Sequence, residues 1–278
     1  MHMKHLRAFG LIIGLLVLMT GSWTTSAQDD SNIPQVTINA TADGFNLSDS
    51  IPEGAATITV QNDTGDAVEA DFFRLNPGVT VEDFEQAVSG DPLNMLGLGT
   101  YLPGIPVPPG ATAEVTYHFL PGEYLLLNWP AEAPEEIIPF TVADVEGEGA
   151  APPEADVELD MVNFAYNIPI RIAAGPQIWH IHNQGDQPHE MIIAGGPGTD
   201  LTAGELNQAL LQLLAGEEVE EGPEPSIFVP PMSPGAELWI TLDLEPGSYI
   251  VLCTFPNLNG NFEPHVALGM RQTFIVTE

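Results

Sequence analysis

The chain has 278 residues, with 5 Lys and Arg against 39 Asp and Glu, which gives a formal net charge of −34. So negative a protein repels nucleic acid and anionic lipid, and this excludes both as partners. Two explanations of the acidity stay open: solubility or adaptation to salt or low pH, and attraction of cationic partners or metal ions. We favour the first, because acidity alone names no ligand.

Residues 1–27 have the pattern of a secretory signal peptide. Lys4 and Arg7 give a positive start, Phe9–Met19 is an apolar run, and Thr25–Ala27 offers small residues for cleavage. The pattern predicts export to the periplasm, the cell surface or the medium. Retention as an uncleaved anchor stays open, whereas cleavage leaves no membrane span.

The rest of the chain reads as two similar halves joined by a linker. The stretch 146–154, EGEGAAPPE, is too polar and too rich in Gly and Pro to pack. It separates residues 33–145, the first half, from residues 155–278, the second half. Leu120–Trp129 and Glu245–Thr254 match nearly position by position, which indicates an internal repeat. The sequence thus predicts one domain in each half.

Short alternating apolar segments between Pro, Gly, Asn and Asp predict β-strands in both halves. Thr80 with Asp83, and Thr202 with Glu205, have the spacing of capping boxes and predict one short helix in each half. Apolar stripes on these helices predict packing surfaces: Val81, Phe84 and Val88 in the first, and Leu206, Leu210 and Leu213 in the second. The prediction is an all-β fold of two tandem sandwiches.

The end of the second half carries the chemistry. A strand through Tyr249 and Val251 ends at Cys253, the only cysteine, and another strand begins at Gln272. A lone cysteine in an exported protein is a buried spectator, an intermolecular thiol or a metal ligand. His265 and Met270 lie in the same loop, and His189 offers a second imidazole. A thiolate, two imidazoles and a thioether are the ligands of a blue-copper site.

Three motifs of the second half resemble the cupredoxins, the plastocyanin- and azurin-like family. They are Cys-Thr-Phe-Pro at 253–256, Asn-Gln-Gly at 183–185 before a His, and His-x4-Met ending at Met270. The resemblance implies a Greek-key β-sandwich that binds one type 1 copper. By it, His189, Cys253 and His265 are equatorial ligands and Met270 the weak axial one. It also implies that His265 exposes one edge, where redox partner proteins dock.

Two features depart from the family pattern. The segment 254–264 between Cys253 and His265 is longer than in plastocyanin, azurin or copper nitrite reductase, and it either bulges outward or opens the site. Glu190 follows the first ligand where azurin-like proteins often carry Asn, which ties the ligand loops together. A carboxylate at this position either accepts a backbone hydrogen bond in its place or changes the potential.

Superposing the repeats places Glu69 opposite His189, Asn128 opposite Cys253 and Glu136 opposite Met270. The first half therefore keeps the scaffold and lacks the ligands, so we expect it to bind no copper. Its role is then structural or a docking surface.

Three further histidines after the predicted signal peptide lie outside this set. His180 and His182 share one face of a strand whose other face, with Trp179 and Ile181, is predicted to be the core. We interpret the pair as surface residues, with a second copper site as the alternative. His118 in the first half has no evident partner.

Cys253 is flanked by Leu252 and Thr254, not by the His that connects type 1 copper to a second copper in copper enzymes. No hydrolase, phosphate-binding or zinc motif appears. The hypothesis is an electron carrier and not an enzyme. The alternatives are a copper-holding or delivery protein, and a metal-free interaction module. The redox partner, the potential and the oligomeric state do not follow from the sequence.

Overall fold

The computed structural model describes residues 32–129, 134, 136–144, 149–197, 201–217, 219 and 225–278. The predicted signal peptide lies outside the described residues, and so do residues 146–148 of the predicted linker. No helix in the described ranges is long and apolar enough to cross a membrane.

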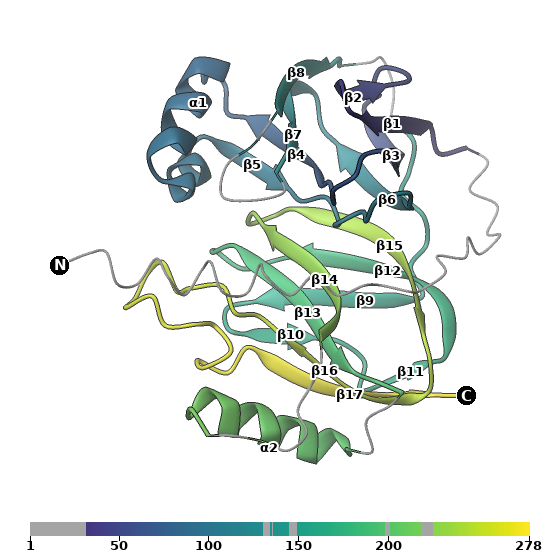
Figure 1. Ribbon diagram of the computed structural model, residues 1–278, viewed down its shortest axis with the longest axis vertical. Coiled ribbons are helices and arrows are strands. Elements are labelled where there is room, and N and C mark those ends of the chain that lie inside the picture. Colours follow the sequence, from purple (N-terminus) through teal and green to yellow (C-terminus); the bar gives the residue numbers. More distant parts are fainter. Residues whose placement is uncertain are drawn as a thin grey trace.

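The described residues fold into three β-sheets with few helices, as an all-β protein of packed sheets (Figure 1). The largest sheet runs through both halves. Its eight strands lie in the order β10 (Ala165–Asn167), β9 (Val157–Val162), β12 (Gly175–Asn183), β15 (Glu237–Leu244), β6 (Thr112–Phe119), β3 (Gly54–Asn62), β1 (Gln35–Thr41) and β2 (Gly44–Leu47).

Each half adds a sheet of its own, which completes a β-sandwich. In the first half the order is β5 (Gly99–Leu102), β4 (Ala70–Leu75), β7 (Gly122–Asn128) and β8 (Glu136–Val142). In the second half it is β11 (Arg171–Ala173), β17 (Arg271–Thr277), β16 (Gly247–Leu252), β13 (His189–Gly195) and β14 (Pro225–Met232).

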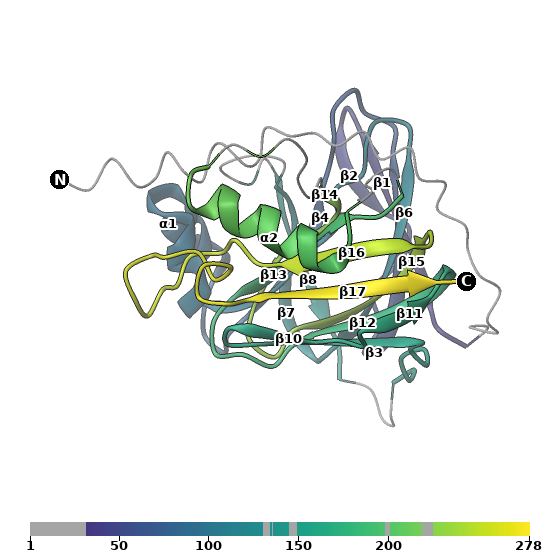
Figure 2. The ribbon, with the colours of Figure 1, turned by 90° about the horizontal axis from the view of Figure 1, so that it is seen from below.

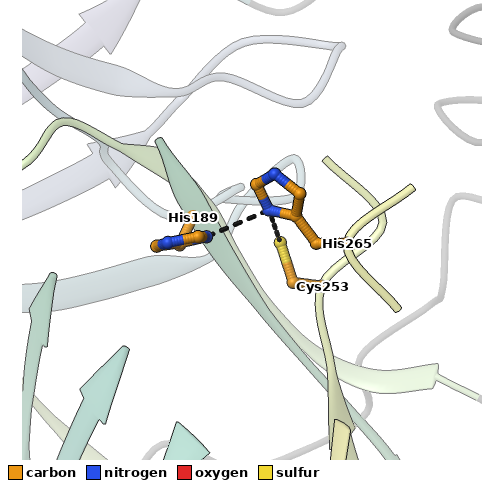
Figure 3. A group of neighbouring side chains, drawn as sticks. All are labelled: His189, Cys253 and His265. Carbon is orange, nitrogen blue, oxygen red and sulfur yellow. Dashed lines mark hydrogen bonds between the residues drawn. The ribbon is translucent and has the colours of Figure 1, made fainter. Parts of the chain in front are cut away.

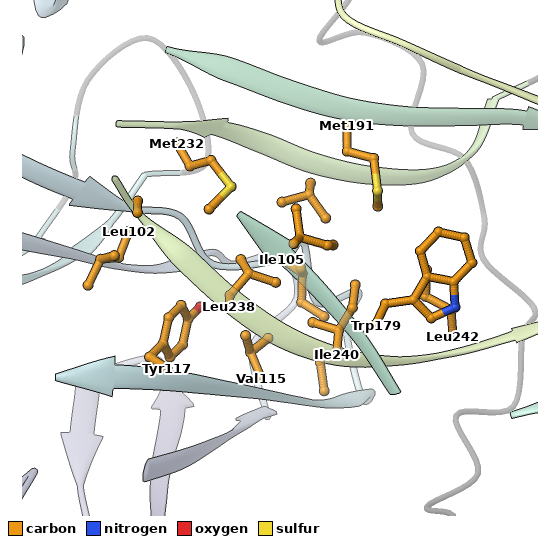
Figure 4. Packing of buried hydrophobic residues seen from close by; sticks show 14 of the residues in the cluster. Leu102, Ile105, Val115, Tyr117, Trp179, Met191, Met232, Leu238, Ile240 and Leu242 are labelled. Carbon is orange, nitrogen blue, oxygen red and sulfur yellow. The ribbon is translucent and has the colours of Figure 1, made fainter. Parts of the chain in front are cut away.

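The two halves meet where β6 pairs with β15, with Tyr117 opposite Leu238. Tyr101 and Ser233 strengthen this junction, because each backbone N–H donates to an oxygen of the other residue, at 2.9 and 3.1 Å. One buried cluster continues across the junction, from Leu102 and Val115 in the first half to Leu238 and Trp179 in the second (Figure 4). Sheet and core are thus shared between the halves.

The two predicted helices are present. They are α1 (Val81–Gly90) and α2 (Ala203–Leu214), and both begin with the expected capping boxes at Thr80 and Thr202. Helix α2 packs along β16 and β17 (Figure 2). Leu206 and Leu210 are buried as predicted, whereas Leu213 is 45% exposed. The first half also has a 3-10 helix, η2 (Pro92–Gly97), which the sequence reading did not include.

The strand register corrects one detail of the repeat. Ala70 pairs with Asn128, and Ile192 pairs with Leu252, so Met191 lies level with Cys253. With Asn128 as the counterpart of Cys253, the residue that replaces His189 in the first half is Val68. The expected equivalence of His189 with Glu69 was therefore wrong by one residue, and Glu69 is instead the counterpart of Glu190.

Candidate metal centre

Three of the four predicted ligands meet at one buried point. His189 begins β13, Cys253 directly follows β16, and His265 lies in the loop before β17. His265 Nδ1 lies 3.0 Å from His189 Nδ1 and 3.4 Å from Cys253 Sγ (Figure 3). All three residues are 0% exposed. The structure thus brings a thiol and two imidazole nitrogens together in a site closed to water.

Strand pairing sets His189 beside Cys253. β13 and β16 are antiparallel neighbours, and the Cys253 side chain points into the main core with Tyr249 and Val251, as predicted. The turn before His189 is held by Asn183, whose amide donates to the carbonyls of Gln187 and Met232 at 2.9 and 2.8 Å. This brace fixes the start of β13.

The loop from Cys253 to Met270 is fixed by its own backbone. The N–H of Val266 donates to Cys253 O at 2.7 Å, and that of His265 donates to Phe255 O at 2.9 Å. The extra residues form an excursion that is closed at its base by a bridge between Pro256 and Pro264. Because the ligands at its ends remain together, the longer segment bulges outward and does not open the site.

Met270 is tied to the other ligands through its backbone. Its N–H donates to His265 O at 2.9 Å, and its carbonyl accepts from Cys253 N at 3.2 Å. Its side chain is 0% exposed and belongs to the same buried cluster as Cys253. A thioether from this position is suited to the weak axial role in a copper–thiolate site.

Asn163 orients the first imidazole. Its Oδ1 lies 2.8 Å from His189 Nε2 and also accepts the Asp186 N–H, while its amide donates to the Asp186 carboxylate. An oxygen at this position requires the proton of neutral His189 on Nε2, which leaves the Nδ1 lone pair facing Cys253 and His265. Nothing in the sequence around Asn163 indicates this role, because it comes from a distant loop.

Burial favours the neutral imidazoles. It lowers the pKa of His189 to about 4, with a further contribution from His265, and it lowers the pKa of His265 to about 4. Burial, followed by the charge of Glu190, raises the pKa of the Cys253 thiol. At neutral pH the site without metal therefore holds two uncharged rings and one protonated thiol.

Glu190 ties the ligand segments together. Its Oε1 accepts from both the N–H and the hydroxyl of Thr254, each at 2.6 Å, and its own N–H lies 3.5 Å from Cys253 Sγ. The carboxylate thus does accept a backbone hydrogen bond, the first of the two roles considered for it. Burial raises its pKa, against the lowering effect of the Thr254 bonds. Behind it, Tyr166 donates its hydroxyl to Glu190 O at 2.5 Å.

The prediction that one edge of the His265 ring is exposed was wrong. The ring is fully buried and packs on Phe164 and Phe255, with ring centroids 4.8 and 6.0 Å apart. Its Nε2 is buried without a hydrogen-bond partner among the described residues. The outward excursion of the long loop is anchored to the turn before His189, because Leu258 N–H donates to Gln187 Oε1 at 2.8 Å.

The residues fit one copper ion. Donor atoms on one ion at about 2.0–2.3 Å, as in zinc sites, lie roughly 3.5 Å apart, close to the separations found here. Two Nδ1 atoms 3.0 Å apart also require something between their lone pairs, either a proton or a metal. A thiolate with two imidazoles and a nearby thioether selects copper over hard cations.

The other three histidines in the described ranges, His118, His180 and His182, form a second group. His180 and His182 lie on the outer face of β12, opposite the buried Trp179 and Ile181, as predicted. They meet Glu237, and His118 Nδ1 lies 3.5 Å from this same carboxylate. The reading of His118 as unpartnered was wrong, because its partner comes from the other half of the chain.

Copper binding should release about one proton per ion near pH 7. With both imidazole pKa values near 4, only the thiol has a proton to lose. Calorimetric titration with Cu(II) in two buffers of different ionisation enthalpy measures this number. It should rise above one as the pH falls toward 4, where the rings become protonated. Release of two or more protons at pH 7 would contradict the neutral rings.

Glu190→Ala should weaken copper binding by about 10–100-fold, the usual effect of losing an outer-sphere partner. It also leaves the half-buried Thr254 N–H without its acceptor, which should cost about 1–3 kcal/mol of unfolding free energy. Glu190→Gln keeps an oxygen acceptor and should retain most of the copper affinity and most of the unfolding free energy. Competition with a copper chelator and urea unfolding provide the measurements. Equal effects of the two substitutions would contradict the bracing role.

No protein-family model matches the chain, and no curated protein matches it. Among solved structures, an auracyanin from Roseiflexus castenholzii is 22% identical with a TM-score of 0.29, over 44% of this chain and 95% of that chain. Auracyanin A of Chloroflexus aurantiacus, a "blue" copper protein, is 19% identical with a TM-score of 0.26, over 43% and 96%. A multicopper oxidase from Campylobacter jejuni is 13% identical with a TM-score of 0.27, over 89% and 65%.

The structure agrees with the expected resemblance in two respects. The described residues form packed β-sheets, and His189, Cys253 and His265 form one buried cluster with Met270 on the same loop.

Proposed function

We propose that the chain is an exported copper protein, periplasmic or extracellular, that transfers single electrons. In this proposal His189, Cys253 and His265 are the equatorial ligands of one type 1 copper and Met270 is the axial ligand. The observation that carries it is the convergence of one Sγ and two Nδ1 atoms at a fully buried point.

The residues around the site support electron transfer through their rigidity. Bound copper supplies a Cu(I)/Cu(II) couple, and such a couple is fast when its ligands keep one geometry in both states. Strand pairing holds His189 and Cys253, Glu190 fixes Thr254, and the Val266 N–H fixes the loop. Burial keeps water from becoming an additional ligand.

Burial favours an electron carrier over a delivery protein. Handing copper to another protein requires an accessible ligand for exchange, whereas His189, Cys253, His265 and Met270 are all 0% exposed. A copper oxidase or reductase of this kind needs a second copper connected to the first through a His beside the Cys ligand. The residues beside Cys253 are Leu252 and Thr254, so this connection is absent. We therefore favour a carrier that is not an enzyme.

Redox partners are proposed to dock over the loop that covers His265. Phe262 and Leu268, 58% and 37% exposed, give this loop an apolar surface. Small apolar patches of this kind suit brief encounters, and interfaces of transient redox complexes bury less than about 1,200 Å². The acidic chain should favour a basic partner.

The first half, 33–145, is proposed to be a ligand-free domain. Val68, Asn128 and Glu136 stand at the positions of His189, Cys253 and Met270. Its Asn62 amide donates to two carbonyls, of Asp66 and Val107, in the manner of Asn183. It therefore keeps the scaffold of the repeat without a thiol or an imidazole at these positions.

The Cu(II)-loaded protein should be intensely blue from thiolate-to-copper charge transfer, with the small copper hyperfine splitting of a type 1 site in its EPR spectrum. Cys253→Ser should lose the band. His118→Ala, a histidine far from the centre, should keep it. A colourless Cu(I) adduct that cannot be oxidised would favour copper holding. The absence of stoichiometric copper at this site would overturn the proposal and leave the metal-free module.

The route of the electron can be tested with a small anionic oxidant. Leu268→Lys should speed oxidation of the reduced protein by ferricyanide roughly twofold or more at low salt, because it adds a positive charge on the exposed turn whose Leu268 N–H bonds to His265 O. Leu120, 47% exposed in the first half, provides the matched control Leu120→Lys. Stopped-flow absorbance gives both rates. Equal acceleration by the two variants would show that the electron leaves elsewhere.

A further inference from the structure

A row of metal-binding side chains crosses the outer face of the eight-stranded sheet where the two halves join. Asp160 on β9 is opposite His182 on β12, and His182 is opposite Glu237 on β15. The register of β15 with β6 continues the row to His118 of the first half. In the next row, His180 is opposite Glu158. Three histidines and three carboxylates thus gather on one face.

The donor atoms of this group are close together. One nitrogen each of His180 and His182 and one oxygen of Glu237 all lie within 4.8 Å of one another. His180 Nε2 lies 2.9 Å from Glu237 Oε2. On one ion with ligand distances of about 2.0–2.2 Å, such atoms lie roughly 3.4 Å apart. A small adjustment of the His182 ring and the Glu237 side chain is enough to place all three on one ion.

His180 is held in the orientation that a metal ligand needs. Its Nδ1 lies 2.7 Å from Glu158 Oε2, and its ring stacks on Trp239 with centroids 4.3 Å apart and planes 4° apart. A histidine ligand normally donates its second ring N–H to a carboxylate, which fixes the tautomer and leaves the other nitrogen for the metal. Glu158 provides this partner through Nδ1, so Nε2, which lies beside Glu237, is the nitrogen left for the metal.

We propose that His180 Nε2, His182 and Glu237 form a second metal site, for a divalent ion of the zinc type, with Glu158 as its outer-sphere partner. Two imidazoles and one carboxylate are a donor set that zinc accepts, with water completing the coordination. The site is half-buried: the side chains of His180 and Glu237 are 16% and 28% exposed. It is independent of the Cys253 centre.

Without a metal, His180 lies between Glu158 and Glu237 and must carry protons on both nitrogens to donate to both carboxylates. Binding of the ion replaces the proton on Nε2, while the Nδ1–H bond to Glu158 remains. Asp160 and the net charge of −34 add attraction for a dication. The bound ion then replaces the His180 proton as the positive charge of the group.

The test is a titration of the full chain with Zn²⁺ after its first site has been filled with copper. We expect one additional Zn²⁺ per chain by calorimetry, and at least tenfold weaker binding in His182→Ala. Co²⁺ in place of zinc should give the visible spectrum of a low-coordinate nitrogen and oxygen site, lost in the same variant. If the first site does not take copper, the titration uses Cys253→Ser, so the two proposals fail separately.

Two further variants distinguish a specific zinc site from general attraction of zinc to the negatively charged surface. Glu158→Gln should weaken zinc about 10–100-fold while leaving all three ligands in place. Glu114→Gln removes one charge from the same exposed face of β6, outside the group, and should bind zinc as the parent does. Circular dichroism checks that each variant is folded. No stoichiometric zinc, or equal binding by His182→Ala and Glu114→Gln, would overturn the proposal.

Discussion

The metal centre depends on the pairing of β13 with β16. Most residues of this antiparallel pair are buried, and its register brings the first residue of β13 near the residue that follows β16. Asn183 holds the turn on one side, and Glu190 bonds across to Thr254 on the other. The ligands are therefore placed by backbone geometry before any metal arrives. A slip of one residue would turn His189 to the opposite face of the sheet.

The features that are encoded locally could be predicted from the sequence. The capping boxes at Thr80 and Thr202 each lie within four residues, and the short apolar run that ends at Cys253 is typical of a buried strand. The set of Cys253, His265 and Met270 was visible because a single loop carries all three. His180 and His182 could be placed on the outer face because residues two apart on one strand share a face, and Trp179 and Ile181 mark the other face as core.

The features that depend on distant pairing were missed. The ring of His265 is covered by Phe164, about a hundred positions earlier in the chain, and His118 finds its carboxylate on Glu237 of the other half. The equivalence of His189 with Val68 depends on the strand register, which the similarity of the two halves in sequence does not fix to one residue. The single sheet shared by both halves leaves no local signal, because two edge strands that pair look like two ordinary strands.

That shared sheet gives the ligand-free half a protective task. β6 and β15 would each be a long edge strand if its own half stood alone, and unpaired edges of this kind recruit other chains into aggregates. Here the two edge strands pair with each other, and Tyr101 N–H donates to Ser233 Oγ at the same junction. The second half, whose one cysteine forms no disulfide within the chain, is in this way kept from pairing with other chains by the strands of the first half.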